Sequence, residues 1–535
     1  MCRGSKLKLR TSPLECFLYL LLMTCLLVGI FMRIDGLGEE SFFIDEFYHV
    51  YAARSFLNDG SFSLPSGEEY RRGAIYTLFV SLCFWLWDVS EFSARLPSVF
   101  FGLGYLLAYY YITSTMFNKR IAIVSTLILA FSHTQIYYSR ECRMYSLFQL
   151  TYLVEVFLIY LLLNRKHMFF DTCRKGGRIG EAFNTFILLV SILFLFFIST
   201  QLLKISYMIV PSMMVFGMYV FLDKQLAHKM GDNMRRVVLA GLIVGTIIAV
   251  AQVNQRLIET ISREFVFRYT PKWALPMEHD VLFYLRSLKH DYFLLWILVP
   301  VGGLIAICKF KRLGFYLISI YLIPLIIQSY LPTKAPRYIL NIYPFGVILV
   351  GIALCRLLEV NVFQSTPKLK TTPAIETKLI LIIMIVVFVM SNQLLAKDEY
   401  KSFLPQKPSW KILSDVLKPY IKEKDLVISD NSVAALYYLG RCDYVVDQNA
   451  LEISEHMEYK NITGQYLDYY TNAIQISGLD DFRKVIGRES PIWVLFGHGA
   501  SGFDEIKEYV RTRGEKFGLV ASEPKVEVYA LRTNE

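Results

Sequence analysis

The stretch LECFLYLLLMTCLLVGIFM occupies residues 14–32, and FFIDEFYHVY follows shortly afterwards at residues 42–51. The first stretch is long enough to cross the roughly 30 Å hydrocarbon core of a membrane as one helix. Basic residues between Arg3 and Arg10 precede it, and no small-residue cleavage site follows it. This pattern predicts an uncleaved membrane helix rather than a signal peptide. The second stretch then places two adjacent carboxylates just outside the membrane.

The composition of the whole chain is that of a membrane protein. Of the 535 residues, 54% are apolar, 15% are aromatic and only 19% are charged. Such a composition excludes a disordered chain and argues against a soluble globular one. The net charge is +10, but the basic residues form short clusters between apolar runs. These clusters are typical of membrane topology signals, so no nucleic-acid partner is expected.

Further apolar segments predict a polytopic α-helical membrane protein. About eleven segments are long enough to span the bilayer, and one shorter run, Ala74–Trp87, ends in Asp88. The long segments are residues 14–32, 97–117, 121–138, 145–163, 183–200, 205–222, 237–254, 292–309, 313–331, 338–357 and 378–396.

The basic loops indicate how the shorter run at 74–87 lies. If it lies flat in the interface as a juxtamembrane helix, all basic loops fall on the side of the N-terminus, which the positive-inside rule assigns to the cytoplasm. If it spanned the membrane, these loops would be translocated. We therefore predict a cytoplasmic N-terminus and, because the number of helices is odd, a C-terminus outside. The loops are Asn118–Arg120, Arg165–Arg178, Lys224–Arg236, Lys309–Arg312 and Lys368–Lys378.

The composition changes after the last apolar segment. We predict a transmembrane domain over residues 1–399 and an extracytoplasmic soluble α/β domain over residues 400–535. In the second domain, short apolar runs predict strands, and one longer amphipathic stretch predicts a helix. The predicted strands are 426–429, 444–446, 492–496 and 526–531, and the predicted helix is 503–513.

Two adjacent carboxylates in the first outer loop could carry chemistry. Asp45 and Glu46 lie among aromatic residues, where desolvation raises the pKa of a carboxyl and favours a general base, whereas a nearby cation would keep it ionised. The alternative is a helix N-cap formed by Asp45. Asp45 and His49 would share a helix face, but two ligands do not make a metal site. We expect no cofactor, with a divalent metal at Asp45 and His49 as the lesser alternative.

Cations recur on the same predicted face. An outer arginine runs against the topology bias, and its forked donors suit phosphate. Each cluster alone could instead be a surface ion pair or a headgroup anchor. Taken together, the clusters indicate a substrate that carries phosphate. Because nucleotide sugars are scarce outside the cytoplasm, a lipid-phosphate sugar is the substrate they favour. The cations are Arg71 and Arg72, Arg140 and Arg143 around Glu141, and Lys334 and Arg337 before Tyr338.

Several motifs resemble those of the GT-C superfamily of integral-membrane glycosyltransferases. The resemblance is strongest to the family of protein O-mannosyltransferases and lipid A aminoarabinose transferases, and it extends over nearly the whole chain. The motifs are Asp45-Glu46, EFSARLPS at 91–98, YSRECRMY at 138–145, PRY at 336–338 and VISDNS at 427–432.

The resemblance implies a GT-C fold and a glycosyltransferase of the inverting kind, which moves a sugar from a polyprenyl-phosphate donor to an acceptor hydroxyl on the outer face. Its partners would be this donor, membrane lipid, and an acceptor glycan, lipid or protein. The late helices lack the β-trefoil insertion of the mannosyltransferase branch, which makes a protein acceptor less favoured. The resemblance implies that Asp45 is the catalytic base with Glu46 in support, and that Arg140, Arg143, Arg337, Lys334, Arg72 and Tyr338 bind substrate or phosphate.

A transporter or flippase of the lipid-linked sugar is the alternative from another class. Alternating access usually requires polar groups near the membrane midplane. Here the charges gather at one interface, with Glu155 and Lys204 as exceptions. A non-catalytic scaffold for the C-terminal domain is a third possibility, but it would leave the outer arginines unexplained.

Overall fold

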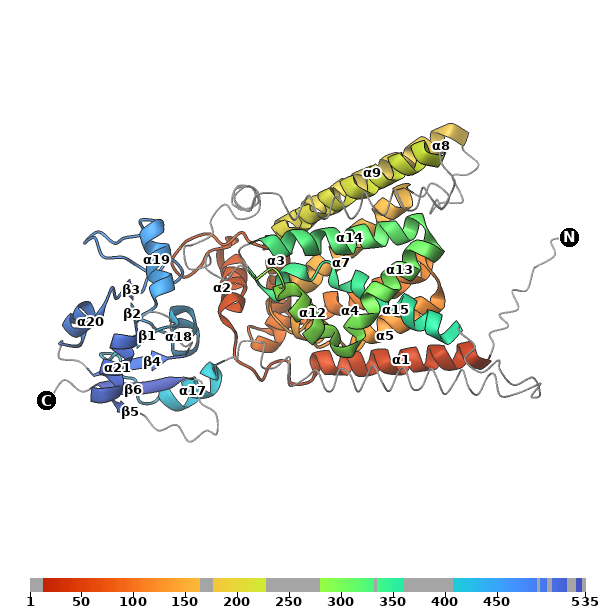
Figure 1. The fold of residues 1–535 in the computed structure, drawn as a ribbon. Coiled ribbons are helices and arrows are strands. Elements are labelled where there is room, and N and C mark those ends of the chain that lie inside the picture. Colours follow the sequence, from red (N-terminus) through yellow and green to blue (C-terminus); the bar gives the residue numbers. More distant parts are fainter. Residues whose placement is uncertain are drawn as a thin grey trace.

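The computed structural model describes residues 13–163, 177–227, 280–331, 334–359, 408–487, 491–497, 503–516 and 526–531. Its helices form a bundle, and an α/β domain lies at one end of this bundle (Figure 1). Helix α1 (Pro13–Ile34) starts at the other end (Figure 1). The start of α1 and the C-terminal domain are therefore separated by the length of the bundle. Which end is cytoplasmic stays a prediction from the basic loops.

Most predicted apolar segments coincide with helices of the bundle. Helix α7 (Tyr145–Leu163) has the same bounds as its predicted segment. The predicted segments 237–254 and 378–396 and the domain boundary at 399 lie outside the described residues. The other bundle helices are α4 (Glu91–Met116), α5 (Lys119–Phe131), α6 (His133–Tyr138), α8 (Gly177–Leu202), α9 (Ile209–Ala227), α12 (Phe283–Tyr292), α13 (Leu298–Phe310), α14 (Arg312–Tyr330) and α15 (Tyr343–Glu359), with short 3-10 turns η2 (Lys204–Met208), η5 (Phe293–Ile297) and η6 (Pro336–Ile339).

The bundle has the helices of a polytopic membrane protein. Within the described ranges, five helices are long and apolar enough to cross a membrane. A sixth candidate is the pair Phe283–Lys289 and Leu294–Phe310, whose two helices are bent by 118°. The predicted class of fold is thus confirmed, whereas the number of eleven helices stays a prediction.

One segment that was predicted as a single helix forms two helices in the structure. The segment 121–138 is divided at Ser132 into α5 and α6. Ser132 has extended backbone angles, and its hydroxyl accepts a hydrogen bond from the backbone N–H of Gln135, as a helix N-cap does. The same hydroxyl lies 2.8 Å from the hydroxyl of Tyr343 on α15. Capping and this tertiary contact override the apolar periodicity of the segment.

The first loop contains two helices, α2 (Ile44–Asp59) and α3 (Ala74–Trp87). At about 1.5 Å per residue, α3 extends only about 21 Å, which is less than the thickness of the hydrocarbon core. One of its faces is buried and includes Val80 and Phe84, while Trp85 and Trp87 are exposed. This pattern fits the predicted juxtamembrane helix.

The C-terminal domain contains a mixed six-stranded sheet in the order β3-β2-β1-β4-β6-β5. The first four strands in this order are parallel, and β6 and β5 pair antiparallel at the end. The four predicted strands and the predicted helix are all present. The elements are β1 (Leu426–Ser429), β2 (Tyr444–Val445), β3 (Ile474–Gln475), β4 (Ile492–Phe496), β5 (Glu515–Lys516) and β6 (Glu527–Leu531), with α17 (Trp410–Leu417), α18 (Ser432–Leu439), α19 (Gln448–His456), α20 (Leu479–Ile486) and α21 (Asp504–Arg513).

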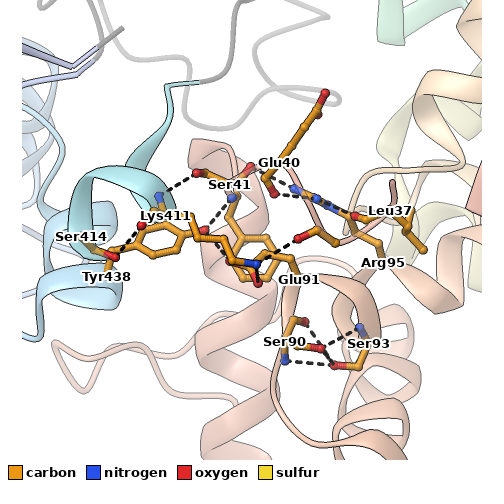
Figure 2. A network of polar contacts seen from close by, with 12 residues as sticks. Leu37, Glu40, Ser41, Ser90, Glu91, Ser93, Arg95, Lys411, Ser414 and Tyr438 are labelled. Atoms are coloured by element: carbon orange, nitrogen blue, oxygen red, sulfur yellow. Dashed lines mark hydrogen bonds and ion pairs between the residues drawn. The ribbon is translucent and has the colours of Figure 1, made fainter. Parts of the chain in front are cut away.

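The C-terminal domain is hydrogen-bonded to the segment that precedes α2 and to Glu91 at the start of α4 (Figure 2). The backbone N–H of Lys411 donates to Ser41 Oγ at 2.9 Å, and the Lys411 ammonium lies 3.2 Å from the Glu91 carboxylate. The Tyr438 hydroxyl donates to Glu91 at 2.9 Å and accepts from the backbone N–H of Phe42 at 2.8 Å. These contacts hold the domain against the entrance of α2, where the two predicted catalytic carboxylates lie.

Candidate active site

Asp45 and Glu46 lie in the first turn of α2. The Glu46 carboxylate accepts a hydrogen bond from the backbone N–H of Phe43 at 2.8 Å, and the Glu46 N–H donates to the Phe43 carbonyl at 2.8 Å. This reciprocal pair satisfies the start of the helix, with Phe43 as the capping residue. The alternative interpretation of Asp45 as the N-cap is therefore wrong.

Glu46 forms a buried ion pair with Arg95 of α4. The two guanidinium contacts measure 2.9 and 3.0 Å, and the two side chains are 1% and 2% exposed. Glu46 also accepts the backbone N–H of Cys142 at 2.7 Å. The other Arg95 donors bind backbone carbonyls of the segment 37–41 (Figure 2). Glu46 therefore joins α2, α4 and the turn before α7, and it positions its neighbour Asp45.

Asp45 pairs with Arg143 from the turn before α7. Arg143 Nη2 lies 3.1 Å from Asp45 Oδ2, and Arg143 Nη1 donates to the Asp45 backbone carbonyl at 2.8 Å. The Asp45 side chain is 38% exposed, whereas that of Arg143 is 2% exposed. One arginine thus fixes both the backbone and the side chain of Asp45 and leaves the carboxylate accessible.

Two more guanidinium groups act on the same carboxylate. Burial raises the pKa of Asp45, but Arg143, Arg337 and Arg72 outweigh this effect, so the pKa lies below its usual value. Arg337 belongs to η6, and the exposed Arg72 precedes α3. Gly73 follows Arg72 with a φ of 65°, and a Cβ there would lie 3.3 Å from the His49 ring. Glycine therefore permits both the left-handed turn and the close approach of this loop to α2.

Two arginines of the site, the buried Arg143 and the half-buried Arg337, each retain an unused donor. Among the described residues, neither Arg143 Nε nor Arg337 Nε has a hydrogen-bond partner. The Arg143 guanidinium lies 5.5 Å from the centroid of the Tyr145 ring, and that of Arg337 lies 5.3 Å from the centroid of the Tyr338 ring. A buried, unpaired N–H is costly, so the site is suited to an anion with acceptor oxygens.

Arg140 and Lys334 have contacts at neighbouring helix ends. Arg140 Nη1 donates to the carbonyls of Met32 and Asp35 at the end of α1, at 2.9 and 2.5 Å. Lys334 Nζ donates to two carbonyls at the end of α14, and burial lowers its pKa to about 8. Cations in such places stabilise helix C-termini. The structure thus groups Asp45 with Arg72, Arg143 and Arg337. Arg140 and Lys334 instead bind backbone carbonyls at helix ends.

His49 lies on α2 in a buried aromatic environment. Its Nδ1 is 2.9 Å from the Thr77 hydroxyl, and its ring packs edge-on against Tyr70 and Tyr76. Burial and the nearby Arg143 and Arg72 lower the pKa of His49 well below its usual value, so the ring is neutral. The part of the chain that the structure describes holds no group of three or more residues that could ligate a metal.

The C-terminal domain also reaches the surroundings of Asp45. Tyr470 stacks on Tyr48, with ring centroids 4.4 Å apart and an interplanar angle of 17°. Burial raises the pKa of both Tyr48 and Tyr470, and the nearby Asp45 charge raises it further, so both are neutral hydrogen-bonding groups. The backbone N–H of Ser66 donates to the Tyr470 carbonyl at 3.2 Å, and the Asn472 side chain donates to the Ser66 carbonyl at 3.0 Å. Contacts of the C-terminal domain with α2 and with the loop around Ser66 therefore hold Tyr470 close to Asp45.

Two residues that help to form this site, Arg95 and Tyr470, were not predicted as site residues from the sequence. Arg95 occurs in the EFSARLPS motif, and the signal for it was a charged residue at the start of a long apolar helix, which must find a buried partner. Tyr470 carries no such signal, because its position depends on how the C-terminal domain docks.

The comparisons with known proteins address the fold. The structure is similar to that of ArnT from Cupriavidus metallidurans bound to undecaprenyl phosphate, with a TM-score of 0.59 and 14% identity over 96% of this chain and 97% of that chain. It is also similar to the archaeal oligosaccharyltransferase AglB from Archaeoglobus fulgidus, in complex with an inhibitory peptide and a dolichol-phosphate, with a TM-score of 0.55 and 12% identity over 91% and 70% of the two chains. No protein-family model and no characterised sequence matches this chain.

These similarities define the class of fold. In both cases the likeness extends over nearly the whole length of this protein. The protein therefore shares its fold with these two structures, and this is the GT-C fold that the sequence motifs predict.

Proposed function

We propose that the protein is an inverting glycosyltransferase that uses a polyprenyl-phosphate sugar as donor and acts on the outer face of the membrane. The observation that carries this proposal is the grouping of three guanidinium groups around one partly exposed carboxylate. The fold supports it, since the two similar structures contain undecaprenyl phosphate and dolichol-phosphate.

In this proposal the arginines bind the donor phosphate. Arg143 and Arg337 would donate their unused Nε–H groups to phosphate oxygens, and Arg72 would approach from the exposed side. Arginine suits this role because its forked donors match phosphate and because it stays protonated. The polyprenyl tail would extend into the membrane from there.

Asp45 would act as the general base. The acceptor hydroxyl oxygen attacks the anomeric carbon, its proton moves to Asp45, and the bond from that carbon to the phosphate oxygen breaks. The departing phosphate takes the electron pair, and the arginines stabilise its charge. One displacement of this kind inverts the anomeric configuration.

The donor itself would strengthen the base. Without donor, the three arginines hold the pKa of Asp45 below its usual value, which makes the carboxylate a weak proton acceptor. A phosphate between the same arginines compensates their positive charge, so the pKa of Asp45 rises. The site would thus become a better base only when a donor is bound.

A transport assay separates this function from the flippase alternative. Full-length protein in proteoliposomes is supplied with an undecaprenyl-phosphate-linked, radiolabelled hexose and with membranes of the source organism as acceptor. The proposal predicts release of undecaprenyl phosphate and transfer of label to an acceptor. If the intact labelled lipid moves between leaflets without cleavage, the protein is a transporter instead.

A further inference from the structure

A cavity lined by charged residues lies at the end of the bundle that is remote from Asp45. It has a volume of about 340 Å³ and is formed where α5 begins and where α13 and α15 end. The other end of α5 leads to the turn that carries Arg143, and α15 starts shortly after Arg337. The cavity and the candidate active site therefore lie at opposite ends of the same two helices.

Four cations line this cavity, and all four are exposed. Lys119 and Arg120 come from the start of α5, Lys309 from the end of α13, and Arg356 from the end of α15. None of the lining residues that the structure describes is acidic. Cations from three helices converge on one cavity, and an anionic ligand would interact favourably with all of them. The positive-inside rule explains cations in these loops but does not require them to converge on one cavity.

The cavity also has an apolar part. Ile305 and Ile352 lie about one helical turn before Lys309 and Arg356, on the membrane side of the two cations. Helices α13 and α15 approach closely next to these residues, because a Cβ at Gly302 would overlap the Leu349 carbonyl. The ligand that fits is therefore charged at one end and apolar at the other.

We propose that this cavity binds the phosphate group of an anionic glycerophospholipid of the surrounding membrane. The four cations would contact the phosphate and headgroup oxygens, and the apolar part would contact the first methylenes of the acyl chains. Under the predicted topology the lipid belongs to the cytoplasmic leaflet. The site is independent of the proposed transfer reaction, which takes place at the other end of the bundle.

The test uses purified full-length protein in a neutral detergent. Binding of phosphatidylglycerol and of phosphatidylcholine with identical acyl chains is measured by native mass spectrometry. Inorganic phosphate and phosphatidylglycerol are also compared by thermal shift, because bound ligands raise the melting temperature. Phosphatidylglycerol should bind about tenfold more tightly than phosphatidylcholine, which carries the same phosphate but a compensating positive charge.

Two matched variants localise the binding. Lys309→Gln removes a lining cation and should weaken phosphatidylglycerol binding about three- to tenfold, and adding Arg356→Gln should weaken it further. Lys311→Gln removes the same charge two residues further on, outside the cavity, and should leave binding unchanged. Equal binding in the wild-type protein, Lys309→Gln and the double variant would overturn the site. Inorganic phosphate that stabilises the protein as well as phosphatidylglycerol does would overturn its assignment to a lipid.

Discussion

Two neighbouring carboxylates on α2 each pair with an arginine from a distant segment, and their surroundings differ. Glu46 and Arg95 are sealed from solvent, and their polar atoms are bonded to each other and to backbone groups of three segments. Asp45 is 38% exposed, and its partner Arg143 retains an unpaired Nε–H. The polar atoms of the sealed pair are satisfied within the protein, whereas the open pair offers an exposed carboxylate and an unused donor. Under the proposed function, this difference separates the positioning role of Glu46 from the catalytic role of Asp45.

The largest expected effect concerns the open carboxylate. Asp45→Asn keeps the size of the side chain but removes proton acceptance, so it should lower turnover by about 10²- to 10⁴-fold. Its melting temperature should stay near that of the wild type. Asp59→Asn, at the exposed other end of α2, is the control and should retain activity. Turnover at the wild-type rate in Asp45→Asn would remove the assigned base.

A change in the sealed pair of Glu46 and Arg95 should lower the stability of the fold more than the activity of the folded protein. Glu46→Gln leaves the buried Arg95 without its counter-charge, which costs about 3–5 kcal/mol of folding free energy. Chemical or thermal unfolding in detergent measures this loss. Any activity of the folded fraction should fall less than in Asp45→Asn, since Glu46 acts only through position. An unchanged unfolding midpoint would show that this pair does not hold α2.

A smaller effect is expected when one donor ligand is lost. Arg337→Gln removes a charge-assisted contact to phosphate worth about 1.5–3 kcal/mol, so kcat/KM for the donor should fall about 10- to 150-fold. Lysine at this position should restore only part of the loss, because it cannot form the forked contact. Full kcat/KM in Arg337→Gln would instead make this arginine a headgroup anchor.

The smallest expected effect is a shift in the pH dependence of kcat/KM, which should differ between variants of the adjacent Arg71 and Arg72. Because Arg72 contributes to the low pKa of Asp45, the base loses its proton below the usual aspartate range and stays ionised at neutral pH. Arg72→Gln raises that pKa, so the acidic limb of kcat/KM should move to higher pH. Arg71 pairs with Glu69 on the surface, so Arg71→Gln should leave the limb in place. Identical shifts in both variants would indicate a general effect of net charge.

The same comparison shows what the sequence could and could not predict. Apolar length and loop charge are local properties, and they predicted the membrane helices. The resemblance of the motifs predicted the GT-C fold, and the motif residues include Asp45 and the cations Arg143 and Arg337. It could not predict that Arg95 selects Glu46 rather than Asp45, since this depends on the packing of α4 against α2. It grouped Arg140 and Lys334 with the phosphate ligands, although both bind carbonyls at helix ends. Arg140 and Arg143 have the same side chain, and only the carbonyl groups nearest to Arg140 in the folded protein distinguish their roles.

The most direct test of the central claim measures binding and turnover in the same two variants. Undecaprenyl phosphate binding to Asp45→Asn and Arg337→Gln in nanodiscs is compared with the wild-type protein, and transfer is assayed in parallel. Asp45→Asn should bind the lipid phosphate at least as tightly as the wild type, because it loses a negative charge beside the phosphate, and yet it should turn over slowly. Arg337→Gln should bind the lipid phosphate about tenfold or more weakly. Loss of lipid binding in Asp45→Asn, or unchanged binding in Arg337→Gln, would contradict the account.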